Sequence, residues 1–244
     1  MSPKSAQWQF GVRLLWTGVG GAVAAYGIYV AFTWYRYGHA ARPVHSEESD
    51  SLLDRLMPTY EVVERHHVRI AAPAETTFLA ACNMNLEQSA VVRAIFKSRA
   101  LILGGKLDSE SAPLGLAAQA RAWGWGVLAE VPGREIVFGA ATQPWLANPV
   151  FIALPPAAFE TFHKPGFVKI AWTLRADSMG ATNSVFHTET RVTTTDPTSR
   201  AKFRRYWALL SPGIILIRRI SLAPLKAEAE RRAHQAILNG RNNP

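Results

Sequence analysis

Residues 167–219 read FVKIAWTLRADSMGATNSVFHTETRVTTTDPTSRAKFRRYWALLSPGIILIRR, and this stretch decides the fold. Two runs in it, 167–177 and 184–195, are rich in β-branched and aromatic residues and alternate between apolar and polar side chains. A short Gly- and Asn-containing turn, 178–183, separates them. The pattern predicts an antiparallel hairpin with one apolar face that another element must cover.

A long helix is expected to begin directly after the hairpin. Thr195 or Asp196 can cap its first turn, and Pro197 suits the first helical position. Its apolar stripe recurs at spacings of four and three and consists of Phe203, Trp207, Leu210, Ile214 and Ile217. Because Pro212 falls within this stripe, between Ser211 and Gly213, we expect a kink there.

Upstream of this stretch, the sequence predicts the rest of a sheet. Residues 60–71 alternate as a strand, and two short helices are expected at 73–81 and 89–103. A second hairpin begins at Trp123 and turns at Pro132-Gly133, whereas 106–120 is ambiguous and 141–165 is a Pro-rich loop. The order predicts an α+β fold in which a curved antiparallel sheet is closed by the long C-terminal helix.

The uncharged segment Leu14–Tyr35 predicts an N-terminal transmembrane helix. At about 1.5 Å per residue its length matches the ~30 Å hydrocarbon layer, and aromatic residues lie near both ends. A cleaved secretory signal, with the cut after 38–40, and a buried core helix are the alternatives. The expected organisation is therefore an anchor at 1–37, a juxtamembrane linker at 38–57, a folded domain at 58–232 and a polar tail at 233–244. Basic residues flank the segment almost equally, so the side of the membrane stays open.

Small residues repeat along one face of the same segment, at Thr17, Gly20, Ala24, Gly27 and Ala31. Such a face lets another helix approach closely, which predicts a homo-oligomer or a membrane-complex partner. The alternative is that Gly and Ala are simply common in membrane helices.

The net charge of +9 is concentrated near the C-terminus. Residues 200–244 contain ten Lys or Arg and two Glu, and therefore carry +8 of it. In an anchored chain, anionic lipid headgroups are the expected partner of this segment, at about 1 kcal/mol per basic residue. No nucleic-acid-binding motif accompanies the charge, so nucleic acid is not expected as a partner.

Several stretches together resemble the SRPBCC superfamily, also called the START or birch-pollen-allergen-like helix-grip fold. They are PTYEVVERHHVRIAAPAETTF, GWGVLAEVPGREIVFGA, FVKIAW, TETRV and the closing helix DPTSRAKFRRYWALLSPGIILIRR. The resemblance spans residues 58 to about 232, looks most like uncharacterised bacterial members, and does not include the anchor. It implies a cavity between sheet and helix for hydrophobic ligands such as lipids, sterols or polyketides, and some relatives are cyclases.

Glu64 and His66 are the candidate catalytic residues. They lie two apart on the apolar face of the first predicted strand, where burial would shift their pKa values. The alternatives are a hydrogen-bonded structural pair and a strand of inverted register, with both side chains in water. The remaining histidines lack metal-ligand spacing, so no metal and no cofactor are expected. A phosphate-binding loop and a hydrolase nucleophile elbow are also missing.

Twelve residues are predicted to line the ligand site between sheet and helix. They are Val62, Val168, Ile170, Trp172, Leu174, Phe186, Thr188, Thr190, Phe203, Trp207, Leu210 and Ile214. Trp172 and Trp207 could floor a pocket or fill it, so a packed core without a cavity stays open. Glu189 and Arg191 fall on the opposite strand face and are expected to form a solvated pair.

Three functions follow from these patterns. The first is a membrane-anchored binding protein for a hydrophobic ligand, such as a lipid, an isoprenoid or a polyketide-like molecule. The second is a cyclase or dehydratase that uses Glu64 and His66 as acid and base. The third is a structural or assembly subunit of a membrane complex.

Overall fold

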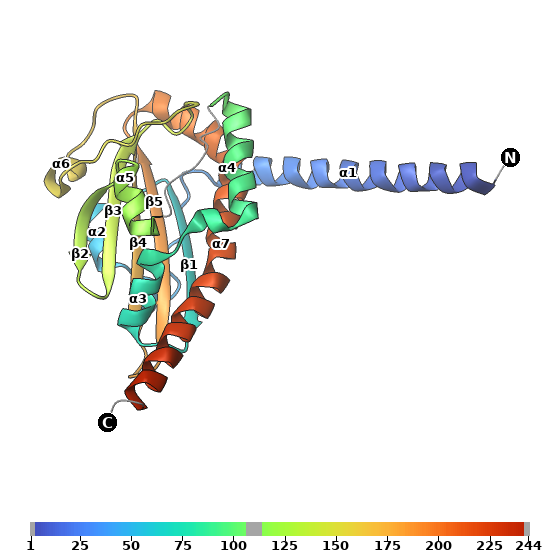
Figure 1. Ribbon diagram of the computed structural model, residues 1–244. Helices are drawn as coiled ribbons and strands as arrows, with labels where there is room; N and C mark the ends of the chain where they lie inside the picture. The colour runs from blue at the N-terminus through green and yellow to red at the C-terminus, as the bar shows by residue number, and fades with distance from the viewer. Residues whose placement is uncertain (1–2, 106–113, 242–244) are drawn as a thin grey trace.

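The computed structural model describes residues 3–105 and 114–241, with side chains from residue 17 to 239 within these ranges (Figure 1). The helices are α1 (Pro3–Arg36), α2 (Ser51–Leu56), α3 (Ala74–Asn83), α4 (Ala90–Leu103), α5 (Leu116–Ala122), α6 (Pro156–Glu160) and α7 (Pro197–Arg241), with short 3₁₀ turns at Ser46–Glu48 and Leu86–Gln88. The strands are β1 (Val62–Ile70), β2 (Gly126–Val131), β3 (Glu135–Thr142), β4 (Val168–Ser178) and β5 (Ser184–Thr194).

The described strands form one antiparallel sheet in the order β1-β5-β4-β3-β2. Both predicted hairpins are present, and the β2–β3 turn places Gly133 at φ 70°, a conformation that glycine adopts without strain. β1 joins the free edge of β5, with Glu64 opposite Thr190 and His66 opposite Thr188. The predicted α+β arrangement of antiparallel sheet and long C-terminal helix is confirmed.

Helix α7 lies against one face of this sheet. The Oδ1 of Asp196 accepts hydrogen bonds from the backbone N–H groups of Thr198 (2.9 Å) and Ser199 (3.0 Å), so Asp196 caps the helix. The helix continues through Pro212. Figure 1 shows its orange first turns running in a different direction from the red remainder, which agrees with the kink expected near Pro212.

Three α-helices, rather than the expected two, connect β1 to β2 in the described part of the chain. Helices α3 and α4 are the predicted ones, and α5 forms from the Ala-rich part of the ambiguous stretch. Gly115 permits this, because a Cβ there would lie 2.7 Å from the Cα of Asn83. Residues 106–113 of the ambiguous stretch lie outside the described residues.

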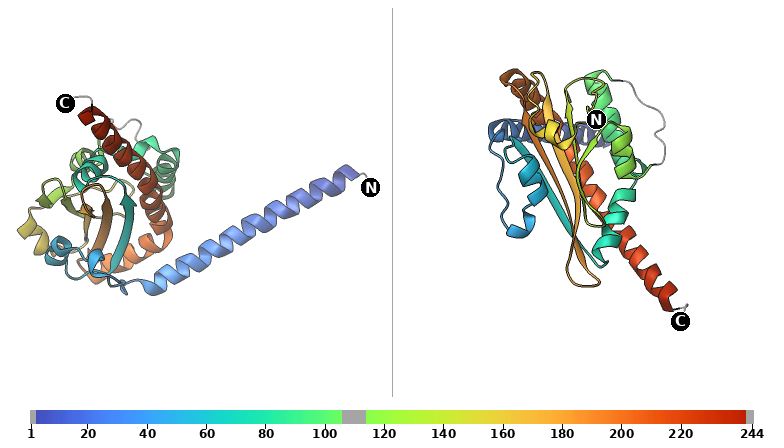
Figure 2. Two further views of the ribbon diagram at one scale, coloured as in Figure 1. Left: turned by 90° about the horizontal axis from the view of Figure 1, so that it is seen from below. Right: turned by 90° about the vertical axis from the view of Figure 1, so that its left-hand side faces the viewer.

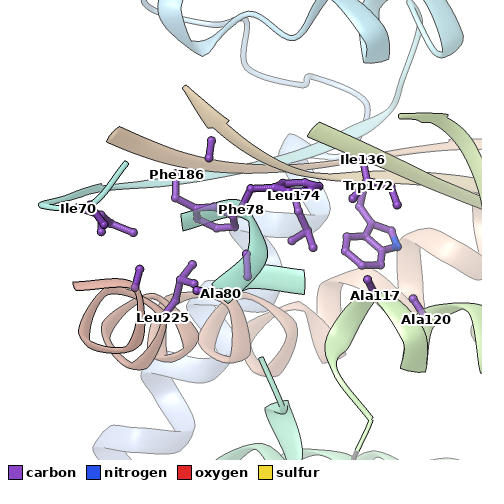
Figure 3. Close-up of a cluster of buried hydrophobic side chains, with 14 of the residues drawn as sticks. Ile70, Phe78, Ala80, Ala117, Ala120, Ile136, Trp172, Leu174, Phe186 and Leu225 are labelled. Carbon is purple, nitrogen blue, oxygen red and sulfur yellow. The ribbon is translucent and has the colours of Figure 1, made fainter. Parts of the chain in front are cut away.

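Helices α3, α5 and the second half of α7 pack on the same sheet face (Figure 3). Phe78 of α3 and Leu225 of α7 meet Phe186 and Leu174 of the sheet, and Figure 3 shows Trp172 directed at the small residues of α5. The ring of Trp172 stacks on that of Phe138 with centroids 4.6 Å apart. Side chains therefore fill this part of the space between sheet and helices.

The opposite face of the sheet is covered by the last part of the predicted juxtamembrane linker, 38–57. Leu53, Leu56 and Met57 are buried there against the sheet and α6. Arg191 is fully buried and donates to Glu189 (2.7 Å), to Asp54 (2.6 Å) and to the carbonyl oxygen of Met57 (2.9 Å). The expectation of a solvated Glu189–Arg191 pair is wrong, because the chain between α2 and β1 folds back over these side chains.

Helix α1 projects away from the sheet, and its C-terminal part contacts α7 (Figures 1 and 2). Judged by length and composition, one helix among the described residues is apolar enough to cross a membrane, and it is the Pro197–Asn239 part of α7. The described part of α1, from Thr17 onward, does not meet this criterion, so the expected N-terminal span is not supported.

Candidate functional site

Five polar side chains lie together between the sheet and α7, and we call them the polar belt. They are Glu64 and His66 of β1, Thr188 and Thr190 of β5, and Arg218 of α7. The strand residues share a face with buried Val62 and Ile70 because side chains alternate along a strand. The Nη1 of Arg218 donates to the Oγ1 of Thr188 at 2.9 Å, which joins helix and sheet.

The polar belt separates two apolar clusters along the length of α7. One contains Val62, Val168, Val192, Phe203 and Trp207, and the other contains Ile70, Trp172, Leu174, Phe186 and Leu225. Burying polar groups in such an interface is unfavourable unless they find partners. The belt is thus the chemically distinctive part of an otherwise apolar sheet–helix contact.

The local environment moves the pKa values of the two belt residues of β1 in opposite directions. Burial raises the pKa of Glu64 above its ordinary value, although Arg218, Arg219 and Arg36 act against this. Burial, with the positive charges of Arg218 and Arg219, lowers the pKa of His66 to about 4. The Nε2 of His66 lies 3.8 Å from the Oε2 of Glu64. Because His66 is neutral at pH 7, this contact is not an ion pair there.

Two buried polar atoms of the belt have no hydrogen-bond partner, the Nε2 of His66 and the Oγ1 of Thr190. A pocket of about 20 Å³, room for about one water, has His66 and Thr188 among its lining residues, but it lies on the other side of the sheet, among Arg65, Arg175 and Glu189. An unpartnered buried polar atom costs about 1–3 kcal/mol. The belt therefore offers two polar atoms that a bound polar group would satisfy.

The structure divides eleven of the twelve predicted lining residues among three environments. The first cluster contains Val62, Val168, Phe203 and Trp207, and Ile170 and Ile214 pack against it. The second cluster contains Trp172, Leu174 and Phe186. Thr188 and Thr190 are in the polar belt, and Leu210 is half-buried on α7. The larger depression, about 360 Å³, lies at the far end of β1 and is lined mainly by polar groups, including Arg69, Asn183, Lys226 and Glu230. It is not the predicted apolar cavity.

The sequence reasoning missed Arg218 as a site residue. A usable indication was present, because Arg218 continues the apolar stripe of α7 four residues after Ile214 and therefore faces the sheet. Among the described residues, no group of three or more His, Cys, Asp or Glu side chains is placed to hold a metal ion. Burial raises the pKa of Cys82 to about 11, which leaves its thiol protonated at pH 7.

No protein-family model matches the chain, and no curated protein matches its sequence significantly. Solved structures with partial likeness include the di-domain aromatase/cyclase BexL of the BE-7585A biosynthetic pathway, at 16% identity and TM-score 0.25, covering 69% of this chain and 46% of that one. The Zhui aromatase/cyclase from Streptomyces sp. R1128 has 15% identity and TM-score 0.21, and the match covers 70% of this chain and 94% of that one. A Deinococcus radiodurans protein has 16% identity and TM-score 0.23, and the match covers 61% of this chain and 98% of that one. Scores this low carry no functional assignment, so function rests on the geometry of the site.

Proposed function

We propose that this protein is a membrane-anchored binding protein for an amphipathic ligand, with the ligand's polar end in the polar belt and its apolar part toward the bilayer. Lipids, isoprenoids and polyketide-like molecules have this chemistry. Membership of the helix-grip superfamily remains part of the proposal.

The observation that carries the proposal is the pair of unpartnered belt atoms, His66 Nε2 and Thr190 Oγ1, beside the guanidinium of Arg218. A carboxylate, phosphate or hydroxyl group would give these atoms a partner. Arg218 favours an anionic group, because a hydrogen bond to a charged group is about twice as strong as a neutral one.

The position of the belt supports entry from the membrane side. β1 is an edge strand, and the Glu64 side chain is 24% exposed, so the belt reaches the outer surface. Arg36, the last residue of α1, is close enough to influence the pKa of Glu64. The end of the proposed anchor and the open side of the belt are therefore neighbours.

The proposed anchor is α1, over the span 14–35. Its described side chains beyond the contact with α7 point into solvent, among them Val19, Val23 and Ile28. Trp34 lies where the span would meet the headgroups, a depth that Trp favours, and the guanidinium of Arg204 lies 4.3 Å from its ring centroid.

Native mass spectrometry of the full chain, purified in nanodiscs, tests the ligand. Arg218→Gln should lose the bound molecule, whereas Arg219→Gln, which changes the neighbouring exposed arginine, should keep it. Equal occupancy in both variants, with both folded by circular dichroism, would contradict the assignment of the belt. A wild-type chain without any bound molecule would contradict the binding function itself.

A second candidate function is a cyclase or dehydratase. The opposed pKa shifts of Glu64 and His66 favour it, because a carboxyl group of raised pKa beside a neutral imidazole is suited to proton transfer. The bound molecule, once identified, would be incubated with fresh protein and weighed again. Loss of one water, or a changed chromatographic retention at the same mass, in the wild type but not in Glu64→Gln supports the enzyme. An unchanged mass and retention in both refute it.

A further inference from the structure

We propose that α4 and the outer ridge of α7 form a second membrane-contacting surface, seated in the bilayer beside α1. We call it the lipid-facing surface and define it by Val91, Leu101 and Ile102 of α4 with Leu209 and Leu216 of α7. The inference rests on the proposed anchoring by α1, and it adds that the domain itself enters the lipid.

The exposed ridge of α7 is apolar where a water-facing helix would be polar. Leu209 and Leu216 are two turns apart, hence on one face, and Leu216 is 44% exposed. Only 17% of the most apolar stretch of α7 is buried. The sheet, α1 and α4 all contact this helix, and Leu209 and Leu216 remain about half exposed beside them.

Helix α4 continues this surface. Val91, Leu101 and Ile102 lie within about 100° of one another at 3.6 residues per turn, and Leu101 and Ile102 are 71% and 65% exposed. The packing of Ile95 is so close to Gly213 that a Cβ there would lie 2.9 Å from its Cγ2, which fixes α4 against α7. Helices α4 and α7 are therefore in direct contact at this point.

Contacts between α1 and α7 set the depth of the surface. The hydroxyl of Tyr26 donates to the carbonyl oxygen of Leu209, and the hydroxyls of Tyr29 and Ser211 are 2.9 Å apart. Tyr26 precedes Tyr35 by nine residues, so it lies roughly 14 Å along the helix axis from the end of the span. If α1 crosses the bilayer, Leu209 lies at the level of the lipid.

The orientation of the helices agrees with this depth. Figure 1 and the left view of Figure 2 show α4 and the middle of α7 running across the axis of α1. A bilayer crossed by α1 would thus contain α4 and the α7 ridge parallel to its plane.

Charge complementarity selects an anionic lipid surface as the partner. Helix α4 carries Arg93, Lys97 and Arg99 and no acidic residue, and Arg205 and Arg219 flank the ridge of α7. Basic side chains beside an apolar face reach headgroups while the face enters the lipid.

The experiment uses the full chain with Cys82→Ala and single cysteines that carry an environment-sensitive fluorophore, in nanodiscs of phosphatidylcholine and phosphatidylglycerol. Leu101→Cys and Leu216→Cys report on the surface, Val23→Cys on α1, and Met179→Cys, 47% exposed at the β4–β5 turn, is the water-exposed control. The two surface labels should shift to shorter wavelength and lose most of their emission when doxyl-labelled lipid is included, as Val23→Cys does.

The outcomes separate this inference from the anchoring. Quenching at Val23 with surface labels that behave like Met179 would overturn the lipid-facing surface and leave the anchor intact. Quenched surface labels without quenching at Val23 would keep the surface and overturn the anchor. A blue shift without doxyl quenching would show that protein covers the surface, and would refute a lipid partner.

Discussion

The guanidinium of Arg191 donates from Nη2 to the Oδ1 of Asp54 at 2.6 Å and so fastens β5 to a helix that begins before the sheet. Arg191 also pairs with buried Glu189, whereas the Asp54 side chain is half exposed. The carboxylates of Glu189 and Asp54 therefore contribute differently to the free energy of unfolding. We expect Glu189→Gln to lower the free energy of unfolding by about 3–5 kcal/mol, because it leaves a buried charge short of its partner.

Asp54→Asn is the matched control for that change. Water screens the exposed carboxylate, so its loss should cost less than about 1 kcal/mol. Urea unfolding of the full chain in mild detergent measures both variants. Equal destabilisation by the two would contradict the assignment of the Glu189 pair as the buried one.

The pH dependence of stability should carry a contribution from Glu135. Burial, with the neighbouring Asp50 carboxylate, raises its pKa from 4.5 to about 8. The folded state then holds a proton that the unfolded state has lost, so stability falls as pH rises from 4.5 to about 8. Glu135→Gln should remove this fall.

The effect of Glu135 on stability is best measured between pH 6.5 and 8. The pKa values of His66 and His187 are lowered from 6.5 to about 4, so the stability that these neutral rings contribute is already complete above 6.5. Thermal unfolding of wild type and Glu135→Gln at both ends of this window provides the comparison. A wild-type stability that rises across the window would refute the raised pKa.

Thr190→Val should separate stability from binding. Valine removes a buried hydroxyl that has no partner, so the ligand-free fold should be equally or more stable. Bound ligand, measured by native mass spectrometry, should fall in the same variant. Thr193→Val, on the opposite strand face, should retain the ligand; equal retention by Thr190→Val would argue against the belt.

The small-residue face of α1 predicts self-association or a partner helix. A Cβ added to Gly20 or Gly27 would meet no atom within 4 Å, and at 3.6 residues per turn Tyr26 and Tyr29, which contact α7, lie on the other side of α1. Gly20→Leu with Gly27→Leu should abolish detergent-resistant association, whereas Ala25→Leu, away from this face, should preserve it. Association that survives the double change would exclude the face as an interface.

The hairpins and the long helix were predictable because they depend on neighbours in sequence. Alternation at 168–178 and 184–194, the Pro132-Gly133 turn and the Asp196 cap are local signals. The shared face of Glu64 and His66 was also predictable, because a strand alternates strictly.

Contacts between distant segments were not predictable in this way. Nothing in the sequence near Arg191 indicates that residues 50–57 cover it. The pattern therefore predicted a solvent-exposed pair of Glu189 and Arg191. Equally, the Ala-rich run after Gly115 became helix α5 through its packing on α3 and the sheet.

The sequence alone determined the α+β order of elements, the face of each strand and the concentration of basic charge toward the C-terminus, because periodicity and composition are properties of the chain itself. The tertiary structure decided that the predicted lining forms two packed clusters with a polar belt between them, and that Arg218 belongs to it. It also placed α4 and the ridge of α7 beside α1. These features depend on which surfaces meet across long sequence separations. The free energy of that packing comes from several segments together and cannot be derived from any one of them.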